Sequence, residues 1–83
     1  MMRFTIQRAA DPQVGECSDA TEWEDFKVGM GEGEEAAREA VESAAEGEPG
    51  CYRARPIGAE SPFAYVRVTD DGLAHLEDTF PAT

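Results

Sequence analysis

The chain has 83 residues and a formal net charge of −11, from 18 acidic and 7 basic side chains. Apolar residues make up 41% of it, which is enough for one modest core, so the composition excludes a fully disordered chain and predicts a single domain over residues 1–83. DNA phosphates and anionic membrane surfaces repel this charge, so we expect no direct binding to nucleic acid or membrane and a basic protein as partner.

The first segments predict a strand and a loop. Residues 2–8 alternate, with Met2, Phe4 and Ile6 on one side, which is typical of a half-buried strand. Residues 9–22 are rich in Asp, Pro, Gly and Ser and predict a loop without a single basic side chain.

A second strand is predicted over residues 23–29, with Phe26 and Val28 on one face and Asp25 and Lys27 on the other. Thr21 and Glu24 have the spacing of a capping box, so a short helical turn is the alternative here. The glycines of the following "GMGEG" run are expected to form the turn from the strand into a helix. Because glutamate replaces the lysine of a phosphate-binding loop, this run does not predict phosphate binding.

The segment 31–50 predicts a helix that is apolar on one side and acidic on the other. Glu34 and Glu35 suit a helix N-terminus, and Gly47 followed by Pro49 is a standard stop. The apolar side consists of Ala36, Ala37, Ala40, Val41, Ala44 and Ala45. Opposite them, within about 60° of one another at the helical repeat, fall Glu35, Glu39, Glu42 and Glu46, which we call the acidic ridge. The small alanines are expected to let the helix lie close to a sheet.

The second half predicts two further strands, in "CYRARPIG" and "FAYVRVTDDG", joined by a turn around residues 58–62. Ala64, Val66 and Val68 are expected to point one way, and "DDG" predicts the next turn. The tail 73–83 is expected to add a short strand or helical turn, with Leu73, Leu76 and Phe80 covering an edge. The order ββαββ predicts an α+β two-layer sandwich, with an antiparallel sheet of about four strands and one helix packed on one face.

No catalytic or metal chemistry is indicated. The N-terminus lacks an apolar signal region, so we expect a cytoplasmic protein in which Cys17 and Cys51 are free thiols. No C-x-x-C pair is present to hold zinc, and His75, the only histidine, is expected to have a packing or surface role. The sequence therefore predicts a protein that is not an enzyme and uses no cofactor.

Charge is segregated along the chain, with acids on the predicted helix and loops and most bases on the predicted strands. Strand arginines beside Tyr65 would suit a nucleic-acid-binding sheet, but the net charge favours their pairing with nearby acids. Two interpretations of the acids remain. They hold hydration in a structural or housekeeping domain of a halophilic organism or its virus, or they imitate a nucleic-acid backbone for a basic protein.

The plan "RFTIQR" … "DFKVG" – "EEAAREAVESAAE" – "CYRARPI" – "FAYVRVT", with its size and charge, resembles the small acidic anti-CRISPR proteins of phages. The resemblance implies a non-enzymatic inhibitor that occupies the basic nucleic-acid channel of a CRISPR effector complex in the host cytoplasm. Charge complementarity predicts the contact residues, which are the acidic ridge (Glu35, Glu39, Glu42 and Glu46), Glu32, and the loop acids Asp19, Glu22 and Glu24.

Overall fold

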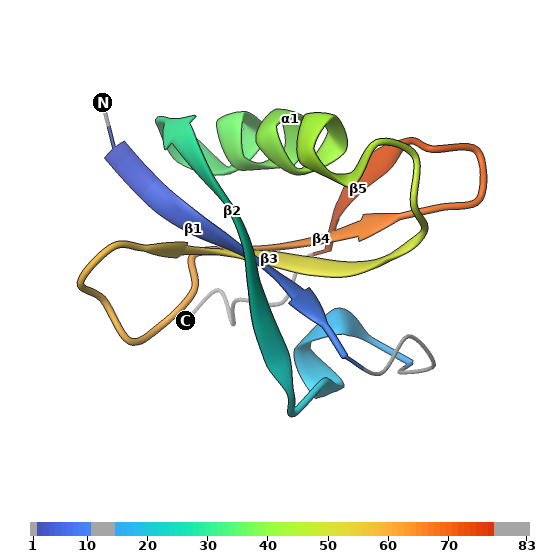
Figure 1. The fold of residues 1–83 in the computed structure, drawn as a ribbon, viewed down its shortest axis with the longest axis horizontal. Coiled ribbons are helices and arrows are strands. Elements are labelled where there is room, and N and C mark those ends of the chain that lie inside the picture. The colour runs from blue at the N-terminus through green and yellow to red at the C-terminus, as the bar shows by residue number, and fades with distance from the viewer. Residues whose placement is uncertain (1, 11–14, 78–83) are drawn as a thin grey trace.

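Five antiparallel strands and one α-helix make up the protein in a computed structural model that describes residues 2–10 and 15–77. The elements are β1 (Met2–Ala9), the 3-10 turn η1 (Cys17–Asp19), β2 (Trp23–Gly31), α1 (Gly33–Ala45), β3 (Gly50–Pro56), β4 (Ala64–Val68) and β5 (Ala74–Glu77). The strands lie in the order β2-β1-β3-β4-β5, and all neighbouring pairs are antiparallel. The helix crosses one face of this sheet and η1 lies on the other (Figure 1).

The predicted α+β class, with an antiparallel sheet and one helix, is confirmed. The sheet has five strands where about four were predicted, because the tail forms the short strand β5, one of its two expected forms, and the order becomes ββαβββ. A tight turn after β4 reverses the chain, with the Gly72 N–H donating to the Thr69 carbonyl at 2.8 Å. This turn places Leu76 opposite Val66, where it packs against the core. Phe80 lies outside the described residues.

The hydrophobic core fills the space between the sheet and α1. Phe4 and Ile6 are fully buried, as the alternation of residues 2–8 predicts, and they meet the helix residues Ala37 and Val41. The predicted inward row of β4 is also confirmed, since Ala64, Val66 and Val68 are all buried. Tyr52 is the largest buried side chain, and its hydroxyl donates to the Glu48 carbonyl at 3.0 Å, so its polar end has a partner.

Strand β2 was predicted correctly as a strand, but its faces were not. The register shifts between Ile6 and Gln7, so that Lys27 pairs with Ile6 and Asp25 with Gln7, and Phe26 is the extra residue of a β-bulge. Phe26 packs against the core, whereas Val28 lies on the opposite face and is 58% exposed. The bulge therefore separates two side chains that strict alternation places together.

Two glycines of β2 allow the helix to approach the sheet. A Cβ atom at Gly29 would lie 2.5 Å from the Phe4 ring, and one at Gly31 would lie 2.5 Å from the Ala36 Cβ. The close packing of helix and sheet therefore depends on small residues on both elements, the expected alanines of α1 and the glycines of β2. Only Gly33 of the three glycines belongs to the turn, where it takes a φ of +83° at the start of α1.

The expectation that the two cysteines are free thiols is wrong, because Cys17 and Cys51 form a disulfide that ties η1 to β3. Both are buried in a second small core with Ala9 and Ala20, on the face of the sheet opposite α1. The pair was not predictable from local sequence, since the two positions are 34 residues apart and only the packing of η1 on the sheet brings them together.

Candidate protein-binding surface

The solvent side of α1 carries a high density of carboxylates. Residues 32–48 contain seven glutamates and one arginine, and three of these glutamates, Glu34, Glu35 and Glu39, are exposed on the helix. The described structure gives Glu34 and Glu39 no hydrogen bond or ion pair of their own. We call these three residues the helix acidic surface; at about 100° per residue Glu35 and Glu39 lie about 40° apart, whereas Glu34, in the first turn, lies about 140° from Glu39. Two members of the predicted acidic ridge, Glu35 and Glu39, belong to it.

Glu42, the third residue of the predicted acidic ridge, is engaged in contacts within the protein and is not free to bind a partner. Its carboxylate accepts the backbone N–H of Ala74 in β5 at 2.9 Å, and it lies 3.4 Å from the Arg38 guanidinium. Arg38 in turn donates to the Ala74 carbonyl at 3.4 Å. The pair therefore fastens the helix to the edge strand β5, and a substitution at Glu42 disturbs the fold before it tests binding.

Glu46 leaves the ridge because the helix ends before it. It takes a left-handed conformation with φ of 51°, and its carboxylate lies 3.7 Å from the Lys27 ammonium on β2. The end of the helix before Gly47 was predicted correctly, but the helix ends at Ala45, so the predicted placement of Glu46 on the acidic ridge is wrong. Glu32 sits at the N-cap and is exposed next to the helix acidic surface.

The loop acids do not join the helix surface. Asp19 belongs to η1, on the opposite side of the sheet from α1 (Figure 1), and its carboxylate accepts the backbone N–H of Glu16 at 3.3 Å. Glu22 is exposed in the same connection. Glu24 belongs to β2 and lies opposite Arg8 in the register of β2 against β1. The eight predicted contact residues are therefore distributed over more than one surface.

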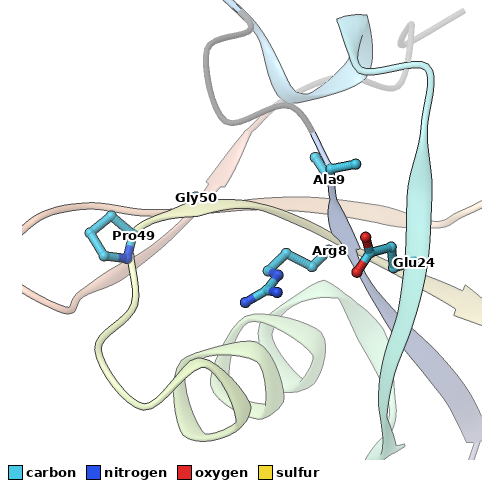
Figure 2. A pocket seen from close by; sticks show the side chains of 6 residues that line it. Arg8, Ala9, Glu24, Pro49 and Gly50 are labelled. Atoms are coloured by element: carbon cyan, nitrogen blue, oxygen red, sulfur yellow. The ribbon is translucent and has the colours of Figure 1, made fainter.

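A concave site of about 270 Å³ lies between the ends of β1, β2 and β3. Figure 2 shows Arg8 and Glu24 lining it from neighbouring strands, with Pro49 and Gly50 across from them. Arg8 is already neutralised, since its guanidinium lies 3.0 Å from the Glu48 carboxylate and over the Phe26 ring. The cavity thus has a cation that is engaged within the protein.

The expectation that the strand arginines pair with nearby acids holds for Arg67 but not for Arg53 and Arg55, which donate to the Gln7 side chain and to the Ala59 carbonyl. Arg67 forms an ion pair with Glu77, and Arg38 one with Glu35 at 2.6 Å. The hydrogen bond that Arg38 donates to Glu35, with the Glu42 and Glu39 carboxylates nearby, raises the pKa of Arg38 above its ordinary value. Arg53 instead stacks over the Trp23 ring, 4.4 Å from its centroid.

Two acids that the predicted contact omitted lie near the C-terminal end of α1. Asp70 and Asp71 are exposed in the turn after β4, and this turn touches the helix stop, because a Cβ at Gly72 would lie 3.5 Å from Gly47. The hydroxyl of Thr69 donates to the Asp71 carboxylate and lowers its pKa. The sequence signal was available in the run of acids after residue 69, but their place beside the helix depended on the fold.

The only histidine of the sequence lies on the last strand of the sheet. His75 is exposed on β5, with its Nε2 atom 3.4 Å from the Thr69 hydroxyl. Within residues 2–10 and 15–77, no cluster of His, Cys, Asp and Glu has the arrangement of a metal site. None of the helices in that part of the chain is long and apolar enough to cross a membrane.

Comparison with protein-family models, with curated proteins and with solved structures gives no match for this chain. The site therefore has to be interpreted from its own geometry and charge.

Proposed function

We propose that the protein is a non-enzymatic acidic binding protein that docks on a basic, nucleic-acid-binding surface of another protein. The anti-CRISPR type of inhibitor is the specific form of this proposal. One observation carries it, namely the exposed carboxylates Glu34, Glu35 and Glu39 on a helix that stands out from one face of the sheet. Asp70 and Asp71 extend the negative field beyond the end of that helix.

Energetics support a role for these charges beyond solubility. Like charges at i,i+4 destabilise a helix by about 0.2–0.5 kcal/mol per pair, and Glu35 and Glu39 form such a pair. Arg38 offsets part of this cost by pairing with Glu35. A surface that only needs to be soluble can mix signs and avoid the repulsion. A cluster of one sign instead attracts a cationic surface and speeds encounter, with an effect screened over about 8–10 Å at physiological salt.

The test uses two double variants with the same change in net charge. Glu34→Lys/Glu39→Lys reverses the helix acidic surface, whereas Glu22→Lys/Glu60→Lys reverses two exposed carboxylates away from the helix. Immobilised wild-type protein is incubated with nuclease-treated cell lysate, and proteins released by salt are identified. We expect a basic nucleic-acid-binding protein that duplex DNA displaces.

The helix variant is expected to lose this capture and the control variant to keep it. Equal loss in both variants would mean that net charge alone, without a defined surface, is responsible. Capture that survives the helix variant would show that the contact lies elsewhere. Both variants are first checked for a wild-type circular dichroism spectrum.

A further inference from the structure

Strand β2 forms an edge of the sheet, and its backbone is open on one side. It pairs with β1 only, and no other strand in residues 2–10 and 15–77 lies along its second edge. At nine residues it is the longest strand. Unpaired N–H and C=O groups on a long edge strand are a template for an additional strand from another chain.

The part of β2 after the bulge has two different faces. Val28 and Met30 point away from the helix and are each 58% exposed, paired in register with Thr5 and Arg3. Gly29 alternates with them on the helix side and offers no side chain. A strand added here finds apolar contacts on one face and open space on the other.

That open space is a groove between β2 and the helix. It has a volume of about 260 Å³ and runs between Lys27–Gly29 and the helix residues Ala40, Ser43 and Ala44. Glu39 is exposed and, at about 100° per residue, lies about 40° from Ser43 on the solvent side of the groove, while the ammonium of Lys27 in the lining is 3.7 Å from the Glu46 carboxylate. A side chain that projects into this groove from an added strand therefore approaches a carboxylate.

The opposite face carries positive charge. Arg3 is exposed beside Met30, and Arg55 lies across Thr5 from Val28, with a buried Nε atom that has no hydrogen-bond partner and an Nη1 atom that donates to the Ala59 carbonyl at 3.2 Å. One carboxylate, that of Asp25, lies on this face beyond the bulge and accepts a hydrogen bond from Gln7, so the face has a net positive charge. These guanidiniums repel lysine and arginine side chains. An added basic strand consequently has one favourable orientation, with its cations toward α1 and its apolar side chains over Val28 and Met30.

We propose that β2 accepts an extended segment of the basic partner as a sixth strand, with alternating basic and apolar residues. Its basic side chains lie opposite Gly29 and Gly31 and reach toward Glu39, and its apolar side chains cover Val28 and Met30. This inference rests on the proposed function and adds the recognised element of the partner. A second copy of the chain is the less favourable occupant, because it would bring two acidic helices together across the new pairing.

The test compares two synthetic peptides of equal composition by isothermal titration calorimetry and by amide chemical shifts. One peptide alternates lysine and valine over eight residues, and the other has the order Lys-Lys-Val-Val twice. We expect the alternating peptide to bind about tenfold more tightly, with shifts in the amides of residues 27–31. The Val28→Asp/Met30→Asp variant is expected to lose that preference and to keep its fold.

Each other result overturns a defined claim. Equal binding of both peptides, with shifts confined to α1, would refute the strand and leave the acidic binding function standing. Absence of binding by either peptide at low salt would refute both. A dimer of the free protein in light scattering, dissociated by Val28→Asp/Met30→Asp, would assign the edge to a second copy and overturn the proposed occupant.

Discussion

The disulfide between Cys17 and Cys51 gives the sharpest prediction of stability. It joins η1 to β3 across a sequence separation of 34 residues. In the chain-entropy account, closing a loop of this length removes about 13 cal/mol/K from the unfolded ensemble, or about 4 kcal/mol at 25 °C. The whole free energy of unfolding of a small domain is about 5–15 kcal/mol, so reduction removes a large part of it.

The assay is thermal unfolding by circular dichroism with and without a phosphine reductant. We expect reduction to lower the Tm by roughly 15–30 °C, since 1 kcal/mol corresponds to about 4–8 °C in a domain of this size. The Cys17→Ala/Cys51→Ala variant is the matched control, because it unfolds near the reduced wild type and does not respond to the reductant. Intact mass under non-reducing conditions reports the bond itself.

Two results would refute this reasoning. Two free thiols in protein purified under oxidising conditions would show that the pair does not form. A Tm that changes by less than about 3 °C on reduction would show that the other contacts of η1, including the Cys17 N–H bonded to Glu77 at 2.9 Å, already hold the segment in place. Neither result would bear on the helix acidic surface, which lies on the other side of the sheet (Figure 1).

Four further outcomes are expected. Glu42→Ala destabilises the fold by about 1–3 kcal/mol in urea unfolding, because the Ala74 N–H of β5 loses its acceptor. The control Glu39→Ala changes the free energy of unfolding by less than about 0.5 kcal/mol. Equal effects of the two substitutions would show that Glu42 does not hold the helix to β5. Gly31→Ala lowers the free energy of unfolding by about 1–3 kcal/mol by the same measurement, since the new Cβ would collide with Ala36 and the residue has a φ of +151°. An unchanged stability would disprove the close approach of α1 to β2. Burial raises the pKa of Tyr52, so the folded state favours the neutral phenol and the free energy of unfolding falls as pH rises above about 10. Tyr52→Phe is expected to remove this dependence of stability on pH. If the dependence persists in the variant, another group causes it. The wild type unfolds cooperatively in dilute buffer, and a requirement for molar salt would instead favour the halophilic interpretation.

Local patterns were sufficient for most elements of the fold. The alternation of residues 2–8 and 64–68 places their apolar side chains on one face of a strand, because successive side chains of a strand point in opposite directions. The helix and its stop at Gly47 follow from apolar spacing and from the freedom of glycine in the left-handed region. The bulge at Phe26 was not predictable, since it depends on the register against β1 and leaves no mark in the composition of β2.

What the sequence by itself determined is the sign and density of the charge and the existence of one helix with an apolar side and an acidic side. What only the tertiary structure decided is which carboxylates remain open to a partner. Glu42 is engaged by the N–H of Ala74, 32 residues away, and Glu46 by Lys27. The two cysteines meet for the same reason. Side chains distant in sequence become partners only through the order and register of the strands, and neither is encoded in any single segment.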